Sequence, residues 1–193
     1  MITLVLGLGN IGLQYEDTRH NLGFMVLDRV VELAKIKSYR QFGYGRAASG
    51  AIGGQAVTLA WPNTHMNRSG LAAEALLENL ELEPREMLVV SDDVNLPLGA
   101  LRFRSGGSDG GHNGLASIIE TLKTEAFPRL RLGIGPLPDR DSLTEFVLGR
   151  FSEAEAEQAK RMVAIAAEAV IFAVRRRLQE AMSKYNNNPA LPE

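Results

Sequence analysis

The stretch from Ile2 to Asn21 constrains the fold more than any other part of the chain. It begins with an uncharged apolar run, which predicts a buried strand, and a glycine-rich turn follows at positions 7, 9 and 12. Glycines at such a turn let the backbone and a ligand approach each other with no side chain between them. The reactive side chains come directly afterwards, and they are Asn10, Tyr15, Arg19 and His20.

An amphipathic helix follows this turn. Its apolar positions repeat with helical spacing from Leu22 to Ala34, and the pattern predicts that the helix ends near Lys35 to Ser38. His20 therefore lies at a helix N-terminus, where the positive end of the helix dipole disfavours the charged imidazole. We expect His20 to serve as a base near neutral pH.

The glycine spacing also fits the dinucleotide-binding fingerprint, Gly7-x-Gly9-x-x-Gly12. In that fold the helix opens within the glycines, and an acidic residue about 20 positions later ends the second strand. Here a polar loop separates Gly12 from the helix, and Asp28 and Glu32 fall inside the helical pattern. The sequence therefore argues against a dinucleotide site.

Length and composition predict one domain over residues 1–193, with a frayed tail at about 187–193. A chain of 193 residues with 45% hydrophobic content can bury one sizeable core. The absence of cysteine excludes disulfides, thiolate zinc sites and a cysteine nucleophile. We find no signal peptide and no apolar run of membrane-spanning length, which predicts a cytoplasmic protein that does not contact membranes.

Charge alone does not identify a partner, because the net charge is only -2. Basic residues nevertheless gather between positions 102 and 131, where Arg102, Arg104, Lys123, Arg129 and Arg131 outnumber the acidic residues. Taken alone, such an excess is typical of a solvated face, although local clustering is also what phosphate binding requires.

The remaining elements alternate between strands and helices. Two runs around Gly53-Gly54 predict a hairpin, and Ser152 with Glu155 predicts the capped start of a long helix. This pattern predicts an α/β fold, a three-layer sandwich in which helices flank a twisted mixed sheet that is mostly parallel. Strands are expected at 46–52, 55–61, 87–90, 101–104 and 129–134, and helices at 71–80, 115–122 and from 152 through 172, continuing or re-forming at 178–182.

Three histidines are present, and each lies in a polar loop beside an asparagine or one residue from it: His20, His65 and His112. Asp92 and Asp93 close the strand predicted at 87–90, where they could orient a histidine or occupy a solvated turn. The spacing of these histidines and aspartates along the sequence matches no metal motif with a short ligand pair, so a zinc site is disfavoured. Together a histidine base, a carboxylate and several carboxamides suit hydrolysis by an activated water, with no covalent intermediate.

A serine nucleophile is the competing chemistry. The stretch Gly106-x-Ser108-x-Gly110 formally fits the nucleophile elbow of serine hydrolases. Those enzymes place their histidine on a distant later loop, whereas the only histidine after Ser108 is His112, close by in sequence. This arrangement argues against a covalent mechanism.

Five ordered motifs resemble those of bacterial peptidyl-tRNA hydrolases, and the match extends from Ile2 to about Asn186. They are Gly7-Leu8-Gly9-Asn10-x-Gly12-x-x-Tyr15-x-x-Thr18-Arg19-His20-Asn21, Thr64-x-Met66-Asn67-x-Ser69-Gly70, Asp92-x-x-x-Leu96-Pro97-x-Gly99, Gly110-Gly111-His112-Asn113-Gly114-Leu115 and Arg129-Leu130-Arg131-x-Gly133-Ile134-Gly135. The resemblance implies a monomer without a cofactor or metal. It also implies cleavage of the ester that joins a peptide to the 3′ ribose of tRNA, which recycles tRNA from aborted translation.

The resemblance also implies roles for individual residues. His20 would activate water, Asp92 rather than Asp93 would hold its imidazole, and Asn10 would help to distinguish a blocked amino group. The other expected contacts are with the peptide and the 3′ end, from Tyr15, His65, Asn67, His112 and Asn113, and with the acceptor-stem phosphate, from Arg104 and Arg131.

Three positions depart from the pattern of this family. Ile11 replaces a usual proline, His65 replaces an aromatic Tyr or Phe, and Asn95 replaces a common aspartate. The alternative function is an RNA-binding relative that has lost catalysis. Loss of His20 or Asp92 would mark such a relative, and both residues are present.

Overall fold

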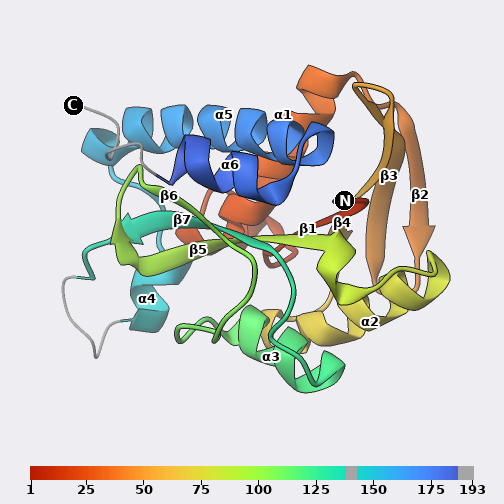
Figure 1. Ribbon diagram of the computed structural model, residues 1–193. Coiled ribbons are helices and arrows are strands. Elements are labelled where there is room, and N and C mark those ends of the chain that lie inside the picture. Colours follow the sequence, from red (N-terminus) through yellow and green to blue (C-terminus); the bar gives the residue numbers. More distant parts are fainter. Residues whose placement is uncertain (138–142, 187–193) are drawn as a thin grey trace.

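The computed structural model describes residues 1–137 and 143–186, which form one seven-stranded sheet between two layers of helices (Figure 1). The strands are β1 (Leu4–Gly7), β2 (Ser38–Phe42), β3 (Gly45–Ile52), β4 (Gln55–Pro62), β5 (Met87–Pro97), β6 (Leu101–Arg104) and β7 (Arg129–Gly135). The α-helices are α1 (Leu22–Ala34), α2 (Ser69–Asn79), α3 (Asn113–Leu122), α4 (Leu143–Leu148), α5 (Glu153–Arg175) and α6 (Leu178–Tyr185). Short 3-10 turns are η1 (Leu13–Tyr15), η2 (Arg19–Asn21), η3 (Met66–Arg68) and η4 (Pro84–Glu86).

The sheet is mixed, with strand order β2-β3-β4-β1-β5-β7-β6. The four central strands, β4, β1, β5 and β7, are parallel, whereas β2, β3 and β6 pair antiparallel at the two edges. The expected α/β sandwich is therefore confirmed, and its parallel pairing is confined to the centre. Carboxyl ends of neighbouring parallel strands meet at one edge of a sheet, where α/β proteins commonly bind ligands.

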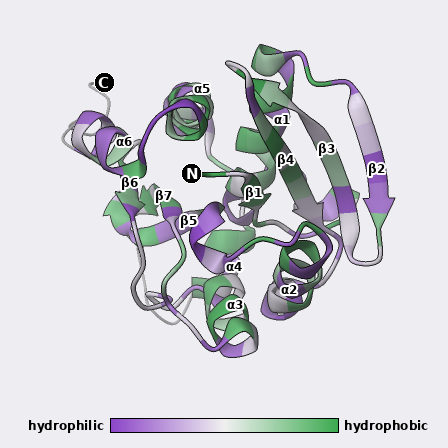
Figure 2. Cartoon of the chain, turned by 45° about the vertical axis from the view of Figure 1, so that its right-hand side comes forward, coloured by the Kyte–Doolittle hydropathy of each residue, from purple (hydrophilic) through white to green (hydrophobic). Residues whose placement is uncertain are grey.

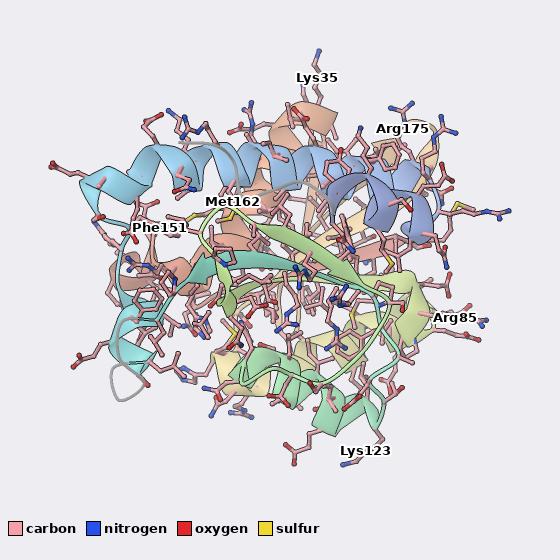
Figure 3. All side chains as sticks on the ribbon, turned by 60° about the vertical axis from the view of Figure 1, so that its left-hand side comes forward. Lys35, Arg85, Lys123, Phe151, Met162 and Arg175 are labelled. Atoms are coloured by element: carbon pink, nitrogen blue, oxygen red, sulfur yellow. The ribbon has the colours of Figure 1, made fainter. Side chains whose placement is uncertain are left out.

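Both faces of the sheet are buried. In β1, Val5 packs among residues of α1, α5 and α6, while Leu4 and Leu6 pack among residues of α2 and α3. This alternation follows from the two-residue period of a strand, and apolar residues on both faces explain the uninterrupted hydrophobic run. Figure 2 shows the hydrophobic residues along the central strands, and Figure 3 shows Met162 directed from α5 toward the sheet while Lys35 and Lys123 point outward.

Several sequence expectations are confirmed. The hairpin turns at Gly53 and Gly54, whose φ angles of 59° and 85° are the positive values that favour glycine in a two-residue turn. Ser152 and Glu155 form a capping box at the start of α5. The C-terminal helical pattern re-forms as α6 after a break at Arg176 and Arg177.

Other expectations were wrong or incomplete. The strand predicted at 87–90 continues to Pro97, because Ser91, Asp92 and Asp93 pair with β7 and sheet pairing overrides the weak strand propensity of aspartate. The sequence pattern missed β2, whose exposed polar residues lack a clear alternation, and α4, which has only six residues. The frayed tail predicted at about 187–193 lies outside the described residues.

A close contact between β1 and α1 positions the turn that carries His20. A Cβ atom on Gly7 would lie 2.6 Å from the carbonyl oxygen of Gly23, and one on Gly23 would collide with the backbone of Leu8. Real side chains do not tolerate such distances, so α1 can pack this closely only because both residues are glycines. The η2 turn, directly before α1, is thereby held at the carboxyl end of β1.

Candidate active site

A pocket of about 250 Å³ opens at the carboxyl ends of the central parallel strands. Residues from the loop after β1, from β5, from α3 and from α4 line it. The lining residues are Asn10, His20, Met66, Asn67, Asp92, Asp93, Val94, Asp109, Gly110, Gly111, His112, Asn113, Leu115, Arg131, Leu143, Thr144, Val147 and Leu148.

His20 contacts Asp92 within this pocket. The Nδ1 atom of His20 lies 2.9 and 3.1 Å from the two carboxylate oxygens of Asp92, and both residues are buried. Because an ionised carboxylate only accepts hydrogen bonds, Nδ1 must donate. In the neutral ring this leaves Nε2 without a proton and therefore able to accept one, as a general base must.

His112 contacts the same carboxylate from another side. Its Nδ1 atom accepts hydrogen bonds from the backbone N–H groups of Gly114 and Leu115 at 3.1 and 3.3 Å. The proton of the neutral ring is therefore on Nε2, which donates to Asp92 Oδ1 at 3.0 Å. His112 thus caps α3 and orients Asp92, while its ring centroid lies 4.8 Å from that of His20.

Asp92 is held as an anion. Burial alone would raise the pKa of this carboxyl, but the imidazoles of His112 and His20 outweigh burial and hold the pKa well below its usual range. A negative charge fixed beside His20 favours the imidazolium that forms when this histidine accepts a proton. The geometry therefore supplies both an oriented base and a charge that stabilises its protonated form.

Asp93 points elsewhere, as expected for the next residue along a strand. Its carboxylate forms an ion pair with Arg131, with 2.7 Å between Asp93 Oδ2 and Arg131 Nε. It also accepts from the backbone N–H of Asn95 at 2.9 Å and from the Asn95 carboxamide at 3.3 Å. That carboxamide also donates to the carbonyl of Gly110 at 3.3 Å, so the asparagine supplies a donor that an aspartate would lack.

Asn10 is held by the residue that follows His20. The backbone N–H of Asn10 donates to the Asn21 carboxamide oxygen at 2.8 Å, and the Asn21 amide donates to the Asn10 carbonyl at 2.9 Å. The Asn10 side-chain oxygen accepts from the Met66 N–H at 3.3 Å, and its amide group, which has no partner among the described residues, is available in the pocket. Sequence reasoning gave Asn21 no role, although its position beside His20 was a usable signal.

A basic face extends from the pocket along β6 and β7. Arg102 pairs in register with Arg131, and Arg104 pairs with Arg129, so strand alternation places all four on one face. Arg104 is exposed, whereas Arg129 is buried, stacks on Phe127 and donates to the Ser108 and Glu125 carbonyls. Burial and the charge of Arg131 lower the pKa of Arg129. We call these four arginines the basic face.

The pocket brings together most of the residues singled out from the sequence. Asn10, His20, Asn67, Asp92, His112, Asn113 and Arg131 all line it. Tyr15, His65 and Arg104 do not, and His65 and Arg104 are exposed. Sequence reasoning missed the wall formed by α4, where Leu143 and Val147 have helical spacing but the segment is too short to be diagnostic.

His20, Asp92 and His112 form a possible metal-ligand group, with ligand atoms within 4.8 Å of one another. These atoms already satisfy one another by direct hydrogen bonds, and the second nitrogen of His112 accepts from the α3 backbone. The donor set therefore fits a hydrogen-bonded triad better than a metal centre. Within residues 1–137 and 143–186, no helix is both long and apolar enough to cross a bilayer.

The family model and the relatives that share 30% or more of their residues with this chain agree with one another. The family model described as "Peptidyl-tRNA hydrolase" matches residues 4–192. The peptidyl-tRNA hydrolase of Aquifex aeolicus (strain VF5) is 42% identical over 185 residues, which cover 96% of each chain. That of Synechococcus sp. (strain JA-2-3B'a(2-13)) is 46% identical over 190 residues, 96% of this chain and 83% of the relative. The crystal structure of peptidyl-tRNA hydrolase from Acinetobacter baumannii has a TM-score of 0.91 at 31% identity, covering 98% of this chain and 96% of that one.

Proposed function

The chain belongs to the peptidyl-tRNA hydrolase family, and on that premise we propose how its pocket works. The reaction is hydrolysis of the ester that joins a peptide, or an N-blocked amino acid, to the 3′ ribose of tRNA. The observation that carries the mechanism is the contact of His20 with Asp92 through Nδ1, which leaves Nε2 for the substrate side.

His20 acts as the general base. Its Nε2 takes a proton from a water molecule, the resulting hydroxide attacks the ester carbonyl, and the proton is then available for the departing ribose oxygen. Asp92 keeps the ring in the required tautomer and stabilises the imidazolium. Because water is the nucleophile, no covalent intermediate with the protein forms.

The carboxamides position the substrate around this base. Asn10, restrained by Asn21 and Met66, binds near the blocked amino group, and Asn67 and Asn113 bind the peptide backbone and the 3′ end. A carboxamide can donate to a carbonyl oxygen whose negative charge grows in the transition state. Tyr15 and His65 contact the terminal nucleotide just outside the pocket.

The basic face binds the acceptor stem. Arg104 is exposed and has no partner among the described residues, so it can contact a phosphate, while Arg131 is held through Nε by Asp93 and offers its other nitrogens to the substrate. Phosphate contacts of this kind fix the orientation of a nucleic acid without reading its sequence. They place the ester at the pocket, beside Arg131.

We further propose that the protein acts as a monomer in the cytoplasm and recycles tRNA during ribosome rescue. The pocket is built from one chain, and translation supplies the substrate. The alternative, an RNA-binding relative without catalysis, is not favoured, because both members of the His20–Asp92 pair are present and in contact.

The decisive experiment is a hydrolysis assay on N-blocked aminoacyl-tRNA, with the unblocked form as the control. We expect cleavage of the blocked substrate and little cleavage of the control. Binding of tRNA without cleavage of either substrate would instead support the RNA-binding alternative.

A further inference from the structure

We propose that Arg19 is a positioning residue that fixes α4, one wall of the pocket, relative to His20 and thereby sets substrate affinity. This inference rests on the function proposed above, because the position of α4 matters only if the pocket takes the peptide end of the substrate. Four residues of α4, Leu143, Thr144, Val147 and Leu148, line that pocket.

The side chain of Arg19 reaches the end of α4 and the segment after it. Its Nη1 atom donates to the carbonyls of Phe146 and Arg150 at 3.4 and 2.8 Å. Carbonyls at a helix C-terminus lack partners within the helix, and a charged donor satisfies them well. Only 9% of the Arg19 side chain is exposed, so these contacts are largely shielded from water.

Two aromatic rings pack against the same guanidinium. Its Cζ atom lies 4.4 Å from the ring centroid of Phe146 and 5.1 Å from that of Phe151. Figure 3 shows Phe151 below the start of α5. Arginine stacks on such faces as a plane, whereas lysine offers only a point charge.

The backbone at Thr18 and Arg19 also contacts the segment that follows α4. The N–H of Arg19 donates to the Gly149 carbonyl at 3.0 Å, and Thr18 forms an isolated antiparallel bridge with Arg150. Residues 18 and 19, which immediately precede His20 in the sequence, therefore hold the end of α4 in place.

Glu155 connects this arrangement to α5. Its carboxylate pairs with Arg19 Nη2 at 2.8 Å and accepts from the N–H and hydroxyl of Ser152, both at 2.8 Å. Burial alone would raise the pKa of Glu155, but the hydrogen bonds from Ser152 and Arg19 lower it below its usual value. Arg19 thus joins the α4 wall to the N-terminus of a long, well-packed helix.

The base itself is held by other contacts. His20 is oriented by Asp92, and Asn10 is held by Asn21; neither interaction passes through α4. Loss of the Arg19 side chain should therefore displace the wall and leave the base in place. We therefore expect a higher KM with little change in kcat. A pocket wall stabilises the bound substrate and the transition state equally, so its loss weakens binding without slowing the chemical step.

The test compares Arg19→Met and Arg19→Lys with the matched control Arg29→Met, which removes an exposed ion pair to Glu32 of the same 2.8 Å length. For peptidyl-tRNA, we expect KM to rise about tenfold in Arg19→Met, because the wall would then occupy its binding-competent position only about a tenth of the time, and apparent affinity falls by that fraction. Arg19→Lys keeps the charge but not the planar stack, so its KM should lie between that of Arg19→Met and the wild type. Amide hydrogen exchange over residues 143–148 should quicken in Arg19→Met but not in Arg29→Met.

Unchanged KM and unchanged exchange in Arg19→Met would overturn the proposal. A lower kcat with unchanged KM and exchange would also overturn it, because Arg19 would then act through His20. If Arg19→Met fails to fold, Arg19→Lys and Glu155→Gln carry the same measurements. A wild-type protein that cleaves no substrate would refute the proposed function instead, while the exchange of α4 would still report on Arg19.

Discussion

The pocket and Arg104, the exposed position on the basic face, hold their charged groups in opposite ways. In the pocket, Asp92 is buried and contacts two imidazoles, so its carboxylate has defined partners and a defined orientation. On the basic face, Arg104 is exposed, and no partner for its side chain appears among the described residues. Fixed geometry suits a chemical step, whereas exposed positive charge suits the capture of a flexible polyanion.

Replacement of His20 should cause the largest loss of activity in the pocket. We expect His20→Ala to lower kcat by on the order of a thousandfold, because general-base catalysis contributes about 10²–10⁴. Binding of tRNA should stay close to that of the wild type, since the basic face is untouched. Single-turnover hydrolysis and a separate tRNA-binding titration measure the two quantities, and wild-type turnover in the variant would assign the base elsewhere.

Replacement of each aspartate by asparagine tests which of the two orients the base His20. Asp92→Asn should lower kcat on the order of 100-fold, because a carboxamide can neither fix both imidazoles as donors nor balance an imidazolium. Asp93→Asn should cost only a few-fold, since Asp93 contacts Arg131 and Asn95 and not His20. Equal losses in the two variants would contradict the division of roles between these neighbours.

Neutralisation of the basic face should act on binding alone. Arg104→Ala should weaken tRNA binding and reduce the salt slope by about one unit, because each phosphate contact releases counterions. The rate at saturating substrate should hardly change. Arg40→Ala, on β2 at the opposite edge of the sheet, is the matched control and should leave the slope intact. An unchanged slope in Arg104→Ala would mean that the tRNA path does not cross this position.

The smallest expected effect is the dependence of thermal stability on pH that Asp92 causes. Because the folded-state pKa of Asp92 is lowered, its ionised form stabilises the fold above its unfolded-state pKa, about 4. This contribution is lost as the pH falls from there toward the folded-state pKa. The melting temperature of the wild type should therefore exceed that of Asp92→Asn by a few degrees near neutral pH, and thermal scans at decreasing pH should show the difference shrink. A difference that grows below pH 4 would contradict this assignment.

How much the sequence predicts depends on whether a feature is formed by local interactions or by tertiary packing. Helix and strand periodicities are local, so the β3–β4 hairpin and the capped start of α5 were predictable. The length of β5 was not, because Asp92 and Asp93 extend the strand only through pairing with β7. The link between Arg19 and Glu155, 136 positions apart, and the second imidazole on Asp92 also depend on tertiary packing.

The contact between Gly7 and Gly23 has a consequence for how this chain can vary. Neither position accepts even a methyl group without moving a strand against a helix, although neither residue lines the pocket. In a saturation library scored for growth or turnover, these two sites should tolerate almost no replacement, as catalytic sites do. Refoldability of the purified variants would separate the two kinds of intolerance: a Gly23→Ala chain loses its architecture, while a His20→Ala chain keeps it and loses only its chemistry.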